Sequence, residues 1–384
     1  MNSPTNCHLC GVGKLRALEA FSDFQQVTSD CKPWPSGGKK ACCEKCGTTQ
    51  AVIDEAWKEA CHRIYSSYTV YHQGGGKEQP VFDANSNAGT PRSLKLLNKL
   101  TQEIDLPEDG RALDIGCGNG NFIRSFSAVR PKWRLNGAEY NRLCETEVLS
   151  IAGVEGFYSG ELETIPGPFD FVSLIHVLEH IENPVPFLKK IAALAPNATL
   201  LIEVPFFRDN PYELLIADHA THYTPNTLAN ILQAAGYSIR AIHTDWILKE
   251  ISAVAMAATT APTTTVVNPD EELATAVDAV AFLDKVRTHA REIRSRAQAF
   301  GVFGTSIGGT WLYSELDGKI DFFVDEDPSR VGKRHLGVEI VSPSQVPPGS
   351  AIFMPLAERV ARDVVKRLQS ASPAEYHYLS TSAA

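Results

Sequence analysis

The sequence predicts an α/β protein whose centre is a doubly wound sheet of parallel strands. Between about residues 105 and 247, apolar segments typical of buried strands alternate with segments of helical pattern. A glycine-rich turn follows the first of these strands, where such a sheet commonly binds a ligand. The alternation starts again near residue 299, which indicates a second, smaller unit of the same kind. With 384 residues, 43% of them hydrophobic, the chain can bury two or three cores.

The glycine-rich turn, residues 113–121 (LDIGCGNGN), directly precedes a helix predicted over Asn121–Val129. Gly116, Gly118 and a third glycine let the backbone turn tightly and approach a ligand, because no Cβ is in the way. Glu139 ends the next predicted strand, where a carboxylate can hold a ribose diol. Asp114, beside the turn, suits a cationic ligand better than a pyrophosphate. A dinucleotide site and a purely structural turn remain as alternatives.

Two further groups of residues follow later strands at the same predicted edge of the sheet. A strand predicted over residues 169–175 leads into His176 and His180, which we expect to line the crevice beyond the strand ends. Glu161 and Leu162 follow the third strand segment and would lie near an adenine. A fifth strand over residues 199–204 ends at the same rim.

The loop after the fifth strand, residues 217–225 (ADHATHYTP), holds the densest cluster of titratable side chains outside the cysteines. Thr224 as N-cap and Pro225 at the first helical position predict a helix over residues 226–235. His219 can exchange protons at neutral pH, and Asp218 could orient a neighbouring imidazole. A capping or packing role for His219 at the sheet edge is the alternative.

Six of the nine cysteines lie within the first 46 residues, which in a reducing compartment more often indicates a metal site than disulfides. Cys7 and Cys10 form one C-x-x-C pair, Cys43 and Cys46 form another, and a glycine follows each pair. Four thiolates make a closed tetrahedral site that suits a structural Zn²⁺. Cys42 could replace Cys43, although only Cys43 keeps the spacing, and cysteines without metal are the alternative.

Tyrosines at three-residue spacing, Tyr65, Tyr68 and Tyr71, precede three glycines at positions 74–76. They predict either one packed helix face or a segment that ends in a loop able to close over a pocket. A helix over residues 93–104 then leads into the central domain.

The C-terminal third begins with a long helix predicted over residues 270–298. A strand (299–303), a glycine-rich turn (304–309), a helix (310–315) and a strand (319–324) ending at Asp325 follow. The turn could hold a phosphate at the helix start, and Asp325 could stand near a ribose. A bound nucleotide portion of a substrate and a fold without ligand are the two interpretations.

The formal net charge of −9 argues against a general attraction to nucleic acid or to an anionic membrane. No apolar run approaches the ~20 residues that span a bilayer. The first residues lack the pattern of a signal peptide. We therefore expect a cytoplasmic protein that acts on a small molecule, with neither nucleic acid nor membrane as partner.

The order of these parts resembles the bacterial S-adenosylmethionine (SAM)-dependent C-methyltransferases that act on nucleotide-linked keto-deoxysugars. The likeness runs through the cysteine pairs, the tyrosine stretch, the glycine turn, residues 176–180 (HVLEH) and residues 324–333 (VDEDPSRVGK). It implies a zinc-binding domain with the tyrosine-rich segment at 1–82 and a class I methyltransferase core at 83–256. A helical connector and a C-terminal Rossmann-like domain would occupy 257–384.

The resemblance also implies roles for individual residues. Asp218 and His219 occupy the place of the family's acid–base pair, and His180 and Tyr71 would face the acceptor. The residues expected to bind SAM are Asp114, Gly116, Gly118, Glu139, Glu161, Leu162 and His176. His219 would remove a proton next to a ketone, and the enolate carbon would then attack the methyl group. O- or N-methylation of another small molecule, or a zinc-containing scaffold with a degenerate core, are the alternatives.

The chain departs from the family pattern at four places. Asp218 stands where the family usually has glutamate, Ile216 where it has tyrosine, and Ile307 where lysine is common. Residues 72–76 (HQGGG) stand where the family has a serine-rich run after the tyrosines. These differences leave the sugar and the methylated atom open.

Overall fold

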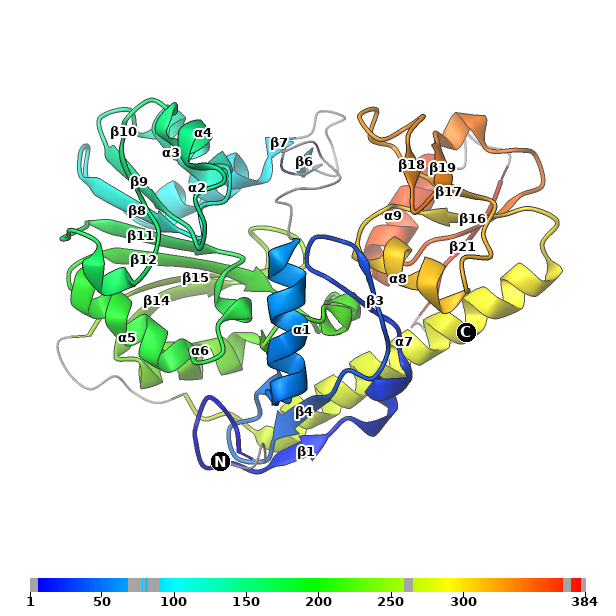
Figure 1. Cartoon of the computed structure of the whole chain (residues 1–384), viewed down its shortest axis with the longest axis horizontal. Coiled ribbons are helices and arrows are strands. Elements are labelled where there is room, and N and C mark those ends of the chain that lie inside the picture. The colour runs from blue at the N-terminus through cyan, green and yellow to red at the C-terminus, as the bar shows by residue number, and fades with distance from the viewer. Residues whose placement is uncertain are drawn as a thin grey trace.

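The computed structural model describes residues 6–67, 78, 80–81, 90–258, 265–368 and 374–380. Figure 1 shows a large sheet with helices on both faces, a smaller α/β unit, and an N-terminal β-sheet near the bottom of the view. The long helix α7 (Pro269–Arg296) packs on the N-terminal sheet and runs to the smaller unit. Among the described residues, no helix combines the length and hydropathy needed to cross a bilayer.

The large sheet has the strand order β10-β9-β8-β11-β12-β15-β14. Its strands are β8 (Arg111–Ile115), β9 (Arg134–Ala138), β10 (Val154–Tyr158), β11 (Phe171–Ile175), β12 (Thr199–Pro205), β14 (Tyr237–His243) and β15 (Glu250–Ala257). Neighbouring strands from β10 to β12 are parallel, as predicted, but β15 is antiparallel to both β12 and β14. β15 lies beyond the alternation predicted over residues 105–247, and it is antiparallel to β14 because residues 244–249 are too few for the crossover that a parallel pair requires.

Helices cover both faces of this sheet. α2 (Arg92–Glu103) and α3 (Asn121–Val129) pack on one face, and α5 (Pro184–Leu194) and α6 (Pro225–Ala234) on the other. Along β11, Phe171 joins the first core while its neighbour Val172 joins the second, because successive strand residues point to opposite faces. The remaining helix of this part, α4 (Glu145–Leu149), follows β9.

The predicted start of α6 is confirmed. The Thr224 side chain accepts a hydrogen bond from the backbone N of Thr227, and Pro225 takes the first helical position. The loop that precedes α6 is therefore anchored at its C-terminal end.

The N-terminal sheet has the order β1-β4-β5-β13 and is antiparallel throughout. Its strands are β1 (Leu15–Ala17), β4 (Lys40–Cys43), β5 (Thr49–Ala51) and β13 (Thr221–His222). A short hairpin, β2 (Gln26–Val27) with β3 (Pro33–Trp34), and helix α1 (Glu55–Ser66) complete this region. The strands β6 (Pro80–Val81) and β7 (Thr90–Pro91) pair antiparallel near the top of Figure 1. Because β13 belongs to the loop after β12, the central domain supplies one strand of the N-terminal sheet.

The smaller unit is a six-stranded sheet of order β18-β19-β17-β16-β20-β21. Its elements are β16 (Phe300–Phe303), α8 (Ile307–Glu315), β17 (Phe322–Val324), β18 (Arg334–His335), β19 (Val338–Val341), β20 (Ala351–Phe353), α9 (Glu358–Leu368) and β21 (Glu375–His377). The strands predicted at 299–303 and 319–324 are β16 and β17. The turn predicted over 304–309 is shorter, since α8 begins at Ile307. A Cβ on Gly309 would lie 2.0 Å from the Gly304 carbonyl oxygen, so glycine there lets the helix start close to the turn.

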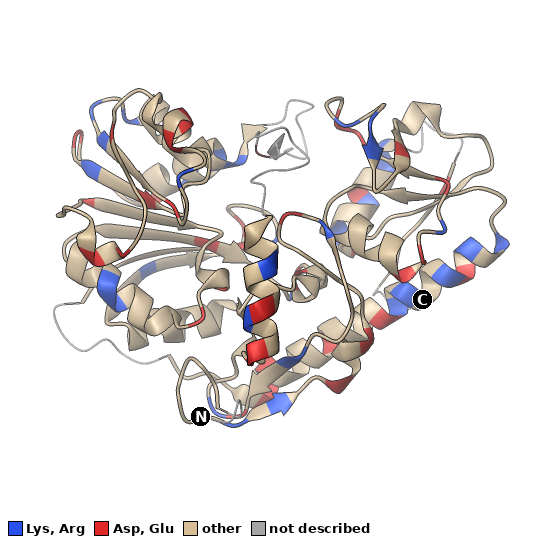
Figure 2. Cartoon of the chain, viewed as in Figure 1, with Lys and Arg blue, Asp and Glu red and all other residues tan. Residues whose placement is uncertain are grey.

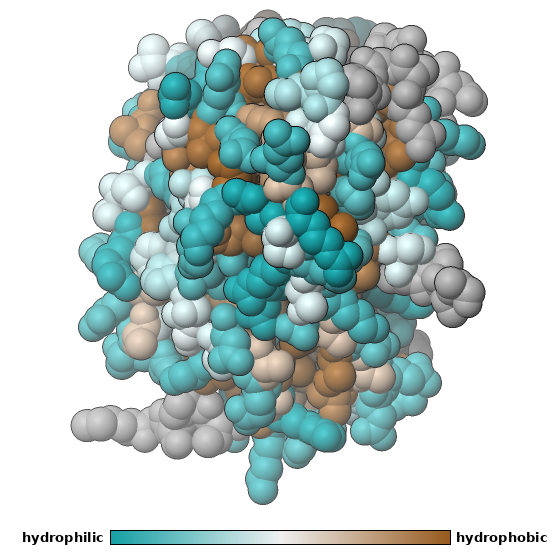
Figure 3. All heavy atoms as spheres, turned by 90° about the vertical axis from the view of Figure 1, so that its right-hand side faces the viewer, coloured by the Kyte–Doolittle hydropathy of each residue, from teal (hydrophilic) through white to brown (hydrophobic). Residues whose placement is uncertain are grey.

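The smaller unit shares its core with the N-terminal segment. Phe21 and Phe24 belong to the same buried cluster as Trp311, and the rings of Phe24 and Trp311 lie 6.2 Å apart. Both acidic and basic residues lie along α1 and α7 (Figure 2), and in α7 the first turn is acidic whereas the last turn is basic. The end of the molecule seen in Figure 3 carries mostly hydrophilic residues with scattered hydrophobic ones. The domain limits at 82 and 256 remain predictions.

Candidate functional site

The glycine-rich turn leaves β8 and faces the start of α3. Gly116, Gly118 and Gly120 adopt φ angles of 73°, 51° and 83°, in the left-handed region that favours glycine. A Cβ on Gly116 would lie 2.2 Å from Cγ2 of Val177, so no larger residue fits there. The backbone N of Gly118 donates to Oε2 of Glu139 at 2.9 Å, which joins the turn to the end of β9.

Asp114 lies buried at the end of β8 and accepts a hydrogen bond from Oγ of Ser173 at 2.7 Å. Burial raises the pKa of Asp114 to about 7, and a bound cation would lower it again. Glu139 accepts one hydrogen bond on each oxygen, from the backbone N atoms of Gly118 and Tyr140, and each oxygen keeps a further lone pair. These residues fit SAM, which carries a sulfonium, an amino group and a ribose.

A network of buried charges lies beyond the ends of β11 and β12. His176 has a φ of 56°, a strained conformation for a residue other than glycine. Its Nδ1 lies 3.1 Å from Glu179 Oε1, and its Nε2 lies 3.6 Å from Glu250 Oε2. Arg92, at the start of α2, pairs with Glu203 and with Glu250. The network fixes the position of His176, whose role toward the cofactor stays a prediction.

Asp218 is fully buried in the loop of residues 216–222, here called the acid–base loop. The backbone N and Oγ of Ser29 donate to its two oxygens at 2.9 and 2.5 Å. Nδ1 of His180 lies 3.4 Å from Oδ2 of Asp218 and 3.1 Å from the hydroxyl of Tyr65. The imidazole that Asp218 orients is thus His180.

The Asp218–His180 contact sets the protonation of both groups. Burial opposes the charged form of Asp218, but the hydrogen bond and charge of His180 hold the pKa of Asp218 well below its usual range. Burial also opposes the charged form of His180, yet its contacts with Asp218 raise the pKa of His180. The pair therefore favours an imidazolium beside a carboxylate.

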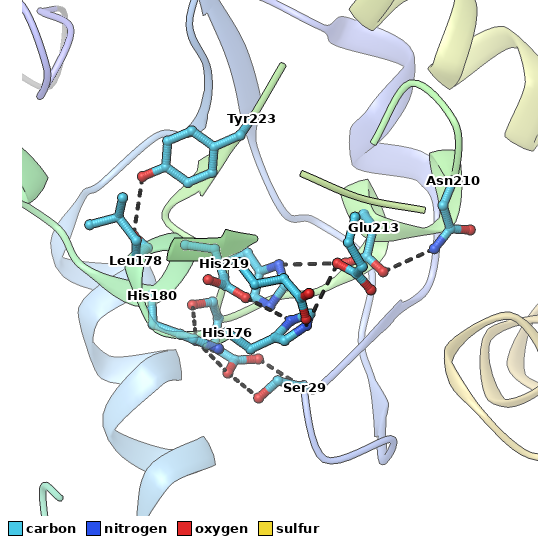
Figure 4. Close-up of polar contacts among 12 residues, drawn as sticks. Ser29, His176, Leu178, His180, Asn210, Glu213, His219 and Tyr223 are labelled. Atoms are coloured by element: carbon cyan, nitrogen blue, oxygen red, sulfur yellow. Dashed lines mark hydrogen bonds and ion pairs between the residues drawn. The ribbon is translucent and has the colours of Figure 1, made fainter. Parts of the chain in front are cut away.

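His219 stands edge-on to His180, with ring centroids 4.6 Å apart and an interplanar angle of 89° (Figure 4). Burial, helped by the charge of His180, holds the pKa of His219 well below its usual value, so this ring is neutral at neutral pH. Its Nδ1 lies 3.8 Å from Oε2 of Glu213. Two adjacent imidazoles with opposite pKa shifts provide a proton acceptor beside a charged donor.

The structure brings the four predicted cysteines together. Their sulfurs lie within 4.8 Å of one another, with 3.6 Å between Cys7 and Cys46 and 3.7 Å between Cys10 and Cys43. Thiolates around a tetrahedral Zn²⁺ at about 2.3 Å would lie about 3.8 Å apart, so the group fits this ion. A Cβ on Gly13 would lie 2.2 Å from Sγ of Cys43, which shows how closely the backbone surrounds the site.

Backbone N–H groups also point at these sulfurs, as thiolates require. The N atoms of Leu9, Gly13 and Lys45 lie 3.3 to 3.4 Å from the sulfurs of Cys7, Cys10 and Cys43. Cys42 instead donates to the carbonyl oxygen of Gly47 and stands apart from the four. A second group with possible metal ligands in the described chain consists of Glu179, His180 and His219.

Other predicted residues lie apart from these groups. Glu161 is exposed, with its Oε2 3.7 Å from Nζ of Lys190, and Leu162 begins a short 3₁₀ helix packed against the core. Asp325 accepts from Oγ1 of Thr305 and pairs with Arg330, so its carboxylate is engaged within the smaller unit. Tyr71, like Tyr68 and the three glycines after it, lies outside the described residues.

Sequence reasoning missed several residues of the site. Glu179 carried a local signal, since it lies between His176 and His180 in the HVLEH stretch. Ser29 and Lys40 carried none, because they reach the acid–base loop from a segment about 180 residues earlier, a separation at which spacing gives no information.

Comparison with known proteins identifies the central part of the chain. Residues 90–242 match a family model described as a methyltransferase domain. A ubiquinone biosynthesis O-methyltransferase of Aeromonas salmonicida is 27% identical over 157 residues, which are 34% of this chain and 63% of that protein. The mitochondrial ubiquinone biosynthesis O-methyltransferase of Schizosaccharomyces pombe is 26% identical over 177 residues, or 42% of this chain and 64% of that protein. The chain thus spans less than two thirds of the length of these curated relatives.

Among solved structures, the mitomycin 7-O-methyltransferase is similar with a TM-score of 0.38 and 22% identity, over 43% of this chain and 54% of that one. The family match and the strand order of the large sheet together show a class I methyltransferase domain, as the sequence predicted. The match and the curated relatives support a SAM-dependent enzyme.

Proposed function

We propose that this chain is a SAM-dependent C-methyltransferase that acts on a nucleotide-linked keto-deoxysugar. The observation that carries the proposal is the pair of imidazoles on and beside the acid–base loop, His219 neutral and His180 charged, with ring centroids 4.6 Å apart. Methylation at carbon needs a base that creates an enolate and a donor that stabilises it. Methyl transfer to oxygen or nitrogen forms no enolate, so it does not need both groups.

SAM, when bound to the glycine turn, would supply a methyl group on a positively charged sulfur. His219 accepts the proton next to the ketone, because its ring is neutral at neutral pH. His180, kept charged by Asp218, donates a hydrogen bond to the enolate oxygen. Tyr71 completes the proposed set as a further hydrogen-bond donor to the enolate oxygen.

The smaller unit is proposed to hold the nucleotide portion of the substrate. The turn after β16 contains Gly304 at a φ of 81° and leads directly into α8, a geometry that can present backbone N–H groups to a phosphate. Asp325 follows the neighbouring strand β17 at the same edge. We also assign Zn²⁺ to the four cysteines, in a structural role.

The test follows proton removal separately from methyl transfer. The chain is incubated with a nucleotide-linked keto-deoxysugar in deuterated water without SAM, and deuterium next to the ketone is measured by mass spectrometry. We expect exchange that His219→Asn abolishes, and transfer of a labelled methyl group to the same carbon once SAM is added. Methyl transfer without any exchange would contradict carbon methylation.

O-methylation of a small molecule is the second candidate, because both curated relatives are named as O-methyltransferases. In that reaction a base removes a hydroxyl proton, and the neutral His219 alone would serve. The two candidates separate in the same experiment, since O-methylation leaves the carbon-bound hydrogens of the acceptor unexchanged.

A further inference from the structure

The N-terminal cysteine module, residues 6–51, holds the acid–base loop along its whole length. The buried Lys40 donates from Nζ to the carbonyl oxygens of Ile216 and His219, both at 3.1 Å. The backbone N of Ala51 donates to the carbonyl oxygen of Ala220 at 2.9 Å, and β5 pairs with β13 directly after it. The loop is therefore built partly by the module and not by the central sheet alone.

His8 links this loop to the metal site. It lies between the ligands Cys7 and Cys10, and its Nε2 is 2.8 Å from Oγ1 of Thr221. Its backbone N donates at 3.3 Å to the side chain of Gln50, the residue that pairs with Thr221 across β5 and β13. One short segment thus contacts the metal ligands and the loop at the same time.

Around the cysteines the module has little apolar core to hold this arrangement without a metal, because its large apolar residues, such as Phe21 and Phe24, pack in the core shared with the smaller unit. The buried cluster at its tip consists of Cys7, Cys43 and Cys46, with Leu9, Cys10 and Leu15 packed against it. β4 ends at the ligand Cys43 and pairs with β5, and β5 in turn pairs with β13 in the acid–base loop. A Zn²⁺ bound by the two cysteine pairs would therefore fix the position of His8 relative to β4, β5 and β13.

We propose that the metal-bound cysteine module is a positioning element of the catalytic site, and that His8 acts through Thr221 to place the acid–base loop. The inference rests on the proposed function, since it concerns the base on that loop. Asp218 and His219 lie within three residues of Thr221, so a shift of Thr221 moves both. A displacement of about 1 Å in such a group can lower the rate about 100-fold.

The first test compares two substitutions of the buried Thr221. Thr221→Val keeps the shape but removes the hydroxyl, and Thr221→Ser keeps the hydroxyl. We expect Thr221→Val to lower kcat on the order of 10- to 100-fold and to shift the kcat–pH profile, with metal content and SAM affinity unchanged. Thr221→Ser, which keeps the hydroxyl, should retain most of the wild-type kcat. Wild-type kcat and pH profile in Thr221→Val would overturn the proposal.

Lys39→Met is the matched control, because Lys39 lies in the same module but pairs with Asp54, 3.1 Å away, and not with the loop. We expect this variant to keep the wild-type kcat. A loss equal to that of Thr221→Val would overturn the assignment of the effect to the loop.

The second test does not depend on methyl transfer. The metal is removed from the full chain with a chelator, its loss is checked by elemental analysis, and hydrogen exchange is followed by mass spectrometry. We expect faster exchange in residues 216–222 and no change in residues 113–121 or in SAM affinity. Unchanged exchange in the loop would overturn the inference. A wild-type chain that transfers no methyl group would refute the proposed function instead, and loop exchange would still decide this inference.

Discussion

Asp218→Asn tests the pairing on which the proposed catalytic site depends. The substitution keeps the shape of the side chain and leaves an oxygen to accept a hydrogen bond from Ser29, but it removes the charge that faces His180. Burial is then opposed by the charge of Glu179 and the backbone oxygen of Asp218 but no longer by the Asp218 charge, so the pKa of His180 falls and its ring carries less charge at neutral pH. The enolate oxygen loses a charged donor.

The distance between His180 and Asp218 gives the size of the expected loss of stability. Opposite unit charges 3.4 Å apart attract by about 5 kcal/mol at an effective dielectric constant of about 20. Removing one partner of a buried pair commonly lowers the free energy of unfolding by about 3–5 kcal/mol. Loss of one donor to an oxyanion commonly lowers kcat about 10²–10³-fold, and we expect a decrease of this size.

The loss of stability should depend on pH. The pKa of Asp218 is lowered from 3.8, so its pairing stabilises the fold above that value, and this stability is lost as the pH falls through the lowered pKa. The pKa of His180 is raised from 6.5, so its contribution is complete below 6.5 and is lost as the pH rises through the raised pKa. The free energy of unfolding of Asp218→Asn should therefore differ most from that of the wild type between about pH 4 and 6.5.

The assay combines urea unfolding at about pH 5.5 and 9 with kcat measured across the same range. We expect a large difference in stability at the lower pH, a smaller one at the higher pH, and a reduced kcat throughout. An equal difference in stability at both pH values, or a wild-type kcat, would refute the pairing of Asp218 with His180.

Two further predictions concern the turn and the base. Gly116→Ala should weaken SAM binding and destabilise the fold more than Gly236→Ala, because both positions have positive φ but only Gly116 meets a neighbour, Cγ2 of Val177 at 2.2 Å. Urea unfolding measures the stability of both variants and titration measures their SAM affinity. Equal losses of stability and affinity in the two variants would contradict the prediction. His219→Asn should abolish methyl transfer and leave the dissociation constant of SAM nearly unchanged, whereas His243→Asn, at a ring stacked on a tryptophan, should keep turnover. Retained turnover in His219→Asn would exclude His219 as the base.

Local patterns predicted much of this molecule. The spacing of Cys7 to Cys10, the glycines after β8, and Thr224 with Pro225 each act within a few residues, and the structure has the elements they predict. The order of strand, turn, helix and strand also brings Glu139 to the turn, and its role toward SAM stays a prediction. These features depend on backbone conformation over short distances along the chain.

The remaining features depend on contacts between distant segments. The pairing of Thr221 with Gln50 and the contact of Ser29 with Asp218 join segments more than 170 residues apart, and no periodicity in the sequence encodes such a register. The choice of His180 over His219 as partner of Asp218 likewise depends on side-chain orientation. The pairing of β15 was not predicted either, because β15 lies beyond the alternation expected over residues 105–247.

The central claim is that the glycine turn, Asp114 and Glu139 bind SAM, and calorimetric titration tests it most directly. We expect one SAM per wild-type chain and, because a carboxylate that holds two hydroxyl groups is lost, an affinity about 10- to 100-fold lower in Glu139→Ala. Glu108→Ala, at an exposed carboxylate paired with Lys132, serves as the control and should bind like the wild type. No binding to the wild type, or equal binding by Glu139→Ala, would contradict the account.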